Sequence, residues 1–288
     1  MQGGHPNSVD HSLMIPAIHR ILGVFAAAAI AWAEAPKQPT TPYGSNPEAA
    51  HWFEHDGLRL YYEVYGQGTP LLLIHGNGES IAEMRFQLDE FRKDHLVIAM
   101  DSRDHGKSAD SPGPVTYELM TDDLAALVDH LGKGPVDVVG HSDGGIEALL
   151  LAIRHPTKVR KIVAAGANTY PEGVKPDALE GMRATLNGLT LEQRKTPQGR
   201  RKWKLHHMML TEPHISPKAL AGIQAPVLIT SSDRDMIRDE HSMEIYHSLT
   251  HGQWAVFPGS GHDVNSEDPE RFNQAVRSFL EIKGSRPR

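Results

Sequence analysis

Residues Pro135–Gly145 read P-V-D-V-V-G-H-S-D-G-G, and this stretch decides which fold the chain can adopt. Its first part is rich in valine, which is typical of a short buried strand. A serine flanked by glycines two positions away follows, and residues 146–152 after it (I-E-A-L-L-L-A) predict a helix. A strand, a G-x-S-x-G turn and a helix in this order form a sharp turn that presents a nucleophilic serine.

The glycines of this turn have a steric purpose. Gly140 and Gly144 remove side chains that would collide in so tight a bend, so that Ser142 can project its hydroxyl at the C-terminal edge of the sheet. The amide of Asp143 then lies at the start of the helix, where the backbone dipole favours negative charge. The turn therefore predicts a nucleophile, the hydroxyl of Ser142, and half of an oxyanion site, the amide of Asp143.

Composition narrows the class of protein. The chain has 288 residues, of which 39% are hydrophobic and 23% charged, as in a soluble globular protein. The net charge of −7 argues against a nucleic-acid partner. Without cysteine there is no disulfide, thiolate metal site or cysteine nucleophile. His206, His207 and His214 lack the spacing to carboxylates that a metal site needs, so we expect no metal and no cofactor.

The first fifty residues differ from the rest. Residues 21–32 are an uncharged apolar run, preceded by His19-Arg20 and followed by small residues at alternate positions. This pattern predicts a signal peptide over residues 1–35, and hence a secreted or periplasmic protein. The run is too short to be a stable membrane anchor. The alternative is an N-terminal helix of a cytoplasmic protein. Residues 36–50 are rich in Pro, Thr, Ser and Asn and predict a linker.

Residues 51–288 alternate between strand and helix patterns. A hairpin is expected over residues 52–65, and continuous apolar runs predict strands covered on both faces. Such alternation predicts an α/β fold with a mostly parallel eight-stranded sheet and helices on both faces. It stops between about residues 168 and 223, where basic and apolar residues interleave and predict a helical cap. The expected strands lie at 70–74, 95–100, 136–139, 161–165, 226–230 and 253–257, and the helices at 81–91, 117–131, 146–152, 241–249 and 272–280.

A serine hydroxyl needs a base, and the base needs an acid. An imidazole can accept the serine proton near neutral pH, and a carboxylate fixes its tautomer. After Ser142 the chain offers acids behind the 226–230 strand and then His262 behind the 253–257 strand. The order serine, acid, histidine at successive strand ends is that of an α/β hydrolase. We favour Asp235 as the acid and expect Asp233 to cap or hold the loop.

The second half of the oxyanion site is expected in the loop after the 70–74 strand. Gly76-Asn77-Gly78 is unobstructed there, so the amide of Asn77 is the predicted donor beside that of Asp143. His75 is expected to brace this loop. For the carboxylate of Asp143 two hypotheses stand: it pairs with a substrate ammonium group, or it is an acid favoured by the helix N-terminus.

Several motifs together resemble the serine-nucleophile branch of the α/β-hydrolase superfamily. Within it, G-H-S-D-G-G and the 166–170 segment G-A-N-T-Y are similar to the biphenyl-hydrolase-like (valacyclovir hydrolase-like) and enol-lactone hydrolase groups. The resemblance implies that Ser142 is the nucleophile, Asp235 the acid and His262 the base. Asp104 departs from the pattern, since the family usually has glycine there. The motifs are His75-Gly76-Asn77-Gly78, Asp101-x-Arg103-x-His105-Gly106-x-Ser108, Gly140-x-Ser142-x-Gly144, Asp235 and Gly261-His262.

These observations predict a serine hydrolase that cleaves an ester, lactone or related acyl bond of a small molecule. The alternatives are a non-catalytic protein that binds a small ligand on the same fold, a cofactor-free perhydrolase and a carbon–carbon bond hydrolase. Ser142 argues against the related dehalogenases and epoxide hydrolases, which use an aspartate nucleophile. A dehydrogenase is disfavoured because no G-x-G-x-x-G follows the first parallel strand.

Overall fold

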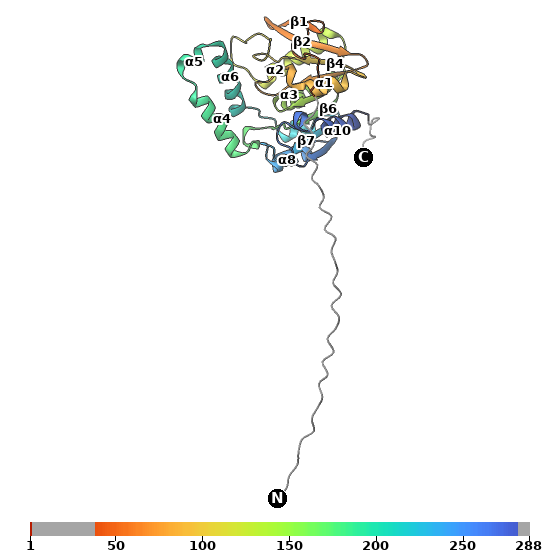
Figure 1. The fold of residues 1–288 in the computed structure, drawn as a ribbon, viewed down its shortest axis with the longest axis vertical. Coiled ribbons are helices and arrows are strands. Elements are labelled where there is room, and N and C mark those ends of the chain that lie inside the picture. Colours follow the sequence, from red (N-terminus) through yellow and green to blue (C-terminus); the bar gives the residue numbers. More distant parts are fainter. Residues whose placement is uncertain (2–37, 282–288) are drawn as a thin grey trace. The chain divides into compact units, whose positions relative to one another are not determined.

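A sheet of eight strands forms the centre of the computed structural model, which describes Met1 and residues 38–281 (Figure 1). The strand order is β1-β2-β4-β3-β5-β6-β7-β8. The pairs β1–β2 and β2–β4 are antiparallel, and the other pairs in the sheet are parallel. The predicted α/β class and mostly parallel sheet are confirmed. The strands are β1 (Ala50–His55), β2 (Leu58–Gly66), β3 (Thr69–Ile74), β4 (His95–Met100), β5 (Val136–His141), β6 (Val159–Ala165), β7 (Val227–Ser232) and β8 (Gly252–Phe257).

Helices cover both faces of the sheet and make two apolar cores. Side chains of α1 and α10 pack on one face, and those of α2, α3 and α8 pack on the other. The parallel strands are therefore buried on both sides, which explains why their sequences are continuously apolar. The helices are η1 (Ile81–Met84), α1 (Arg85–Phe91), α2 (Tyr117–Leu131), α3 (Asp143–Arg154), η2 (Pro156–Lys158), η3 (Pro171–Gly173), α4 (Pro176–Gly188), α5 (Leu191–Lys195), α6 (Pro197–Thr211), α7 (Pro217–Ala221), α8 (Asp239–Ser248), α9 (Val264–Glu267) and α10 (Pro269–Glu281).

The segment expected to be a cap contains η3 and the four helices α4 to α7. α4, α5 and α6 lie together beside the sheet (Figure 1), and α6 contacts both α4 and α5. At the end of the segment α7 packs against α8, and the main core includes Leu205 and Met208 of α6 as well as Leu220 of α7. The extent expected for the cap, about residues 168–223, stays a prediction.

The segment for which we expect a linker is partly packed. Tyr43 is buried, and its hydroxyl donates to Asp89 at 3.0 Å. The fully buried carboxylate of Glu63 accepts the main-chain N–H groups of Gly44 at 2.8 Å and Asn46 at 3.1 Å. A buried carboxylate needs such donors, so it fixes residues 43–49 against the domain although their composition is that of a linker.

The expected signal peptide, residues 1–35, lies outside the described residues apart from Met1. Within residues 38–281 no helix combines the length and the apolar character needed to cross a bilayer.

Candidate active site

The turn between β5 and α3 is as tight as its sequence predicts. Ser142 has φ 54° and ψ −118°, a conformation that L-residues rarely adopt. A Cβ atom on Gly140 would lie 2.0 Å from the carbonyl oxygen of Gly144, and one on Gly144 would lie 2.3 Å from that of Ile74. The predicted collisions are therefore confirmed, and the serine is held in a strained conformation at the end of a buried strand.

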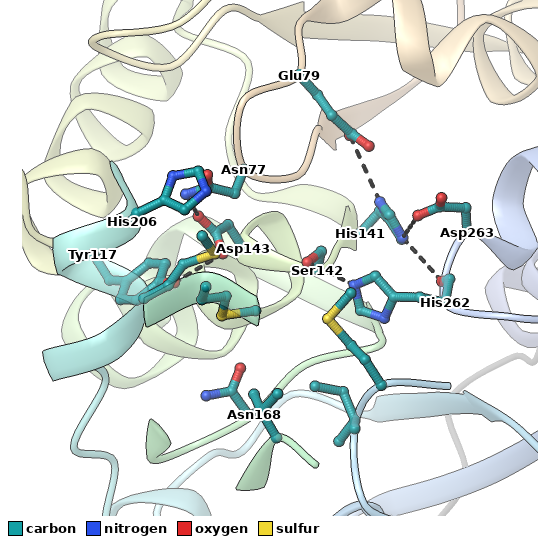
Figure 2. A pocket seen from close by; sticks show the side chains of 15 residues that line it. Asn77, Glu79, Tyr117, His141, Ser142, Asp143, Asn168, His206, His262 and Asp263 are labelled. Atoms are coloured by element: carbon teal, nitrogen blue, oxygen red, sulfur yellow. Dashed lines mark hydrogen bonds and ion pairs between the residues drawn. The ribbon is translucent and has the colours of Figure 1, made fainter. Parts of the chain in front are cut away.

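Three side chains from three strand ends meet at this turn. His262 Nε2 lies 2.8 Å from Ser142 Oγ (Figure 2). His262 Nδ1 lies 2.6 Å from Asp235 Oδ1. The side chain of Asp235 is only 2% exposed, and the same oxygen accepts the main-chain N–H of Ile237 at 3.0 Å. A carboxylate at Nδ1 fixes the proton there, so Nε2 is free to accept the serine proton.

Asp233 has a different surrounding. It is exposed, and its Oδ1 accepts the main-chain N–H of Gly259 at 2.7 Å. The carboxylate therefore ties the loop after β7 to the loop that carries His262. This is the loop-holding contact expected of it from the sequence.

The loop after β3 is braced from two sides. His75 is buried; its Nδ1 donates to the carbonyl of Gly76 at 2.8 Å, and its Nε2 accepts the N–H of Ser102 at 3.1 Å. The bracing role expected of His75 is confirmed. In the described part of the chain, the main-chain N–H groups of Asn77 and Asp143 have no hydrogen-bond partner. Both are thus available to an anionic oxygen.

The carboxylate of Asp143 is buried and has a partner on each oxygen. Asn77 Nδ2 donates to Oδ2 at 2.8 Å, and the hydroxyl of Tyr117 donates to Oδ1 at 2.8 Å (Figure 2). Burial raises the pKa of this carboxyl, and burial also raises that of the Tyr117 hydroxyl. Sequence reasoning missed Tyr117, because its position on α2 looks like any apolar contact of a core helix.

A cavity of about 300 Å³ opens above the serine. One part of its wall is polar and the other part is apolar, and both include side chains from the segment 168–211. Met209 lines the cavity, whereas its neighbour Met208 is buried in the core. No local pattern distinguishes these positions, so sequence reasoning did not find them. The polar wall includes Asn77, Tyr117, Asp143, Asn168 and His206, and the apolar wall consists of Val174, Met182, Met209, Met236 and Ile237.

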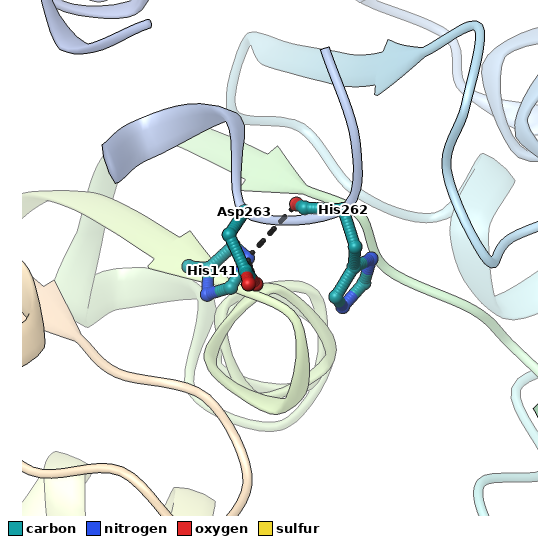
Figure 3. A group of neighbouring side chains, drawn as sticks. All are labelled: His141, His262 and Asp263. Atoms are coloured by element: carbon teal, nitrogen blue, oxygen red, sulfur yellow. Dashed lines mark hydrogen bonds and ion pairs between the residues drawn. The ribbon is translucent and has the colours of Figure 1, made fainter. Parts of the chain in front are cut away.

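Three side chains lie close enough to one another to share a metal ion. His141, His262 and Asp263 each offer a ligand atom, and these atoms lie within 4.8 Å of one another (Figure 3). However, both ring nitrogens of His262 already have partners, and His141 Nε2 lies 3.1 Å from the carbonyl oxygen of His262. A metal would have to replace these contacts, and we assign none.

Comparison with known proteins agrees with this architecture. The sequence pattern of the α/β hydrolase fold matches residues 69–214, about half of the chain, and the chain belongs to this family. It is 26% identical over 262 residues to the (E)-2-((N-methylformamido)methylene)succinate hydrolase of Acinetobacter baylyi, covering 82% of this chain and 96% of that protein.

Two further similarities extend over most of the chain. Human serine hydrolase BPHL is 26% identical over 268 residues, covering 84% of this chain and 90% of that protein. The crystal structure of the enol-lactonase from Burkholderia xenovorans superposes with a TM-score of 0.67 at 21% identity, covering 80% of this chain and 99% of that one. At that identity the enol-lactonase shows the fold alone.

Proposed function

We propose that this protein is a serine hydrolase that cleaves an ester, lactone or related acyl bond of a small molecule. The observation that carries the proposal is the continuous chain from Ser142 Oγ through both ring nitrogens of His262 to the buried carboxylate of Asp235, at 2.8 and 2.6 Å. Both distances are those of hydrogen bonds. The first lets the serine proton pass to His262, and the second keeps the proton of Nδ1 in place and stabilises the imidazolium. The similarity to a human serine hydrolase supports the same chemistry.

The proposed mechanism has two half-reactions. His262 Nε2 takes the proton of Ser142 as Oγ bonds to the acyl carbon, and the resulting oxyanion accepts the N–H groups of Asn77 and Asp143. The imidazolium then protonates the leaving oxygen as its bond to carbon breaks, which leaves an acyl-enzyme. Water attacks this ester after giving a proton to His262, and the proton returns to Ser142 as the acid leaves.

The cavity supports a small substrate with one apolar side. At about 300 Å³ it is at the lower end of the range of small-molecule sites. Its methionines can adapt to acyl groups of different shape. Its polar wall next to Asp143 would receive the more polar end of the substrate.

A fluorophosphonate probe tests the proposed nucleophile. We expect labelling of the native protein at Ser142 and its loss in Ser142→Ala, with the fold retained by circular dichroism. A binding protein without turnover would remain unlabelled. Labelling at another residue, or labelling that survives in Ser142→Ala, would overturn the proposal.

A substrate panel then distinguishes acyl cleavage from its alternatives. We expect hydrolysis of p-nitrophenyl esters or lactones of short acyl chains, and each hydrolysis should be lost in Ser142→Ala. Carbon–carbon bond hydrolysis and perhydrolysis use the same fold, so the panel includes a vinylogous diketone and hydrogen peroxide with a carboxylic acid. A marked preference for either of these over every ester and lactone would contradict the proposed bond class.

We make a separate proposal for the side chain of Asp143. Because both of its oxygens already accept internal hydrogen bonds, from Asn77 and Tyr117, we propose that it chiefly holds the oxyanion loop in place. Pairing with a substrate ammonium group stays a prediction. If Asp143→Asn leaves the preference for aminoacyl esters over plain esters unchanged, that prediction is wrong.

We also propose that residues 1–35 direct export. N-terminal sequencing of the protein recovered from its native source tests this: a mature chain that begins near residue 36 supports it. A chain that retains the apolar run at 21–32 contradicts it.

A further inference from the structure

We propose that His141 and Glu79 form a positioning pair that holds the loop of the catalytic base and the oxyanion loop in register with the nucleophile. This inference rests on the proposed function. Neither residue has a step in the proposed mechanism. The ring of His141 does pack beside that of the base, since its centroid lies 5.2 Å from that of His262. His141 and Glu79 both line the cavity beside Ser142 (Figure 2).

His141 connects the nucleophile turn to the loop of the base. It directly precedes Ser142 at the end of β5, and its side chain is 2% exposed. Its Nε2 lies 3.1 Å from the carbonyl oxygen of His262 and 3.5 Å from Oδ1 of Asp263 (Figure 3). The ring therefore donates a hydrogen bond to the main chain of the residue whose imidazole must face Ser142.

Glu79 connects His141 to the oxyanion loop. Its Oε2 accepts the main-chain N–H of Gly76 at 2.7 Å and lies 3.7 Å from His141 Nδ1. The first contact is a hydrogen bond and the second is an ion pair. Gly76 directly precedes Asn77, so the carboxylate holds the chain immediately before the proposed oxyanion donor.

The electrostatics agree with a charged pair. Burial alone would lower the pKa of His141, but the carboxylate of Glu79, the carbonyl of His262 and the carboxylate of Asp263 raise it above its usual value. Burial alone would raise the pKa of Glu79, but the His141 ring and the N–H of Gly76 lower it to about 2. His75 is a further group that lowers it. An imidazolium donor makes a stronger bond to the carbonyl than a neutral ring would.

Catalysis is sensitive to this kind of support. A misplacement of about 1 Å in a catalytic group costs on the order of a hundredfold in rate. The loop that carries His262 runs from the end of β8 at Phe257 to α9, which is a single turn, Val264–Glu267. The bond from His141 is thus a direct link between the peptide unit of the base and the strand that carries the nucleophile.

The test compares His141→Leu, His141→Gln and Glu79→Gln. We expect His141→Leu to lower kcat and the rate of fluorophosphonate labelling by about ten- to a hundredfold with little change in KM. His141→Gln keeps an N–H near the position of Nε2 and should recover most of this loss. His141→Gln removes a positive charge beside the base and should move the acidic limb of the pH–rate profile to higher pH. Glu79→Gln removes a negative charge and should move it to lower pH. His155→Gln, which changes a histidine paired with Asp122 at 2.7 Å at the end of α3, is the matched control.

Amide hydrogen exchange over residues 259–265 gives a readout that does not need activity. We expect faster exchange there in His141→Leu than in the native protein, and no change in His155→Gln. If the native protein is not labelled by the probe, the proposed function fails, while exchange still decides whether His141 holds this loop. Unchanged exchange together with unchanged kcat in His141→Leu would overturn the inference. If His141→Leu does not fold, the same two measurements on Glu79→Gln and His141→Gln decide it.

Discussion

Two carboxylates two positions apart show how much a side chain's chemistry depends on its surroundings. Asp235 is buried and bonded to His262, whereas Asp233 is exposed and holds the main chain of Gly259. In sequence both simply follow β7. A buried carboxylate can stabilise an imidazolium without competition from water, and an exposed one cannot do so to the same extent.

At the residue scale we predict that these two acids respond differently to the same substitution. Asp235→Asn should lower kcat by about ten-thousandfold, because an amide stabilises the wrong tautomer of His262. Asp233→Asn keeps an oxygen acceptor for the N–H of Gly259 and should change kcat less than about tenfold. Steady-state kinetics on the best ester of the panel measures both. A larger loss in Asp233→Asn would mean that the acid is assigned to the wrong residue.

At the scale of elements, α6 is anchored to the loop after β4. Lys204 Nζ donates to Asp104 Oδ1 at 2.6 Å and to the carbonyl of Ser111 at 2.6 Å, and Arg201 pairs with Asp110. The side chain of Asp104 is fully buried and its φ is 60°. The glycine usual at this position would adopt this backbone more easily, so the aspartate accepts strain where it gains a partner from α6. Two basic residues of α6, Arg201 and Lys204, therefore anchor this helix.

We predict that this anchor stabilises the fold through a pair and not through either residue alone. Lys204→Met should lower the free energy of unfolding by about 3 kcal/mol, because it leaves the buried carboxylate of Asp104 without its cation. Adding Asp104→Gly should recover at least half of that loss, since the charge and the backbone strain go together. Urea denaturation measures both variants.

The control for this prediction is Lys202→Met, a change of the same kind at an exposed position of α6. It should alter stability by less than about 0.5 kcal/mol. Asp104 Oδ2 also accepts the main-chain N–H of Ser111 at 3.0 Å. A double variant as unstable as Lys204→Met alone would show that the bonds of Lys204 and Asp104 to Ser111, and not the ion pair, anchor the helix.

At the scale of the whole molecule, the buried titratable groups act in opposite directions on stability. Burial lowers the pKa of His105 to about 3, so the unfolded chain takes up a proton below about pH 6.5 that the folded protein refuses. This destabilises the fold as the pH falls. Burial raises the pKa of Glu147 well above its usual value, so the folded protein takes up this proton first and is stabilised as the pH falls.

We therefore predict the effect of His105 on stability from a comparison of the native protein with His105→Asn. In His105→Asn the amide can still donate to the carbonyl of Arg103, as His105 Nδ1 does at 2.8 Å, but it does not titrate. Between about pH 6 and pH 4 the free energy of unfolding of the native protein should fall more steeply than that of the variant, by about 1.4 kcal/mol per pH unit. Urea denaturation at several pH values measures both slopes, and groups such as Glu147 cancel. Parallel slopes would contradict a buried neutral His105.

Much of the fold and the centre of the site could be predicted because their signals are local. Strand β4 and helix α2 have the expected bounds, since their apolar periodicity follows directly from burial on both faces or on one. The order Ser142, Asp235, His262 placed each side chain at the C-terminal end of a parallel strand. These ends share one edge of a sheet, and this is why three residues far apart in sequence could be expected to meet.

The sequence by itself determined the fold class, the strained turn at Ser142 and the set of residues able to meet at one edge of the sheet. Only the tertiary structure decided that Tyr117 and Asn77 hold Asp143, that His141 and Glu79 connect the loops, and which faces of α4 and α6 line the cavity. The physical reason is that a local pattern reports whether a residue is buried. Its partners depend on how elements distant in sequence pack against one another, and no single element carries that information.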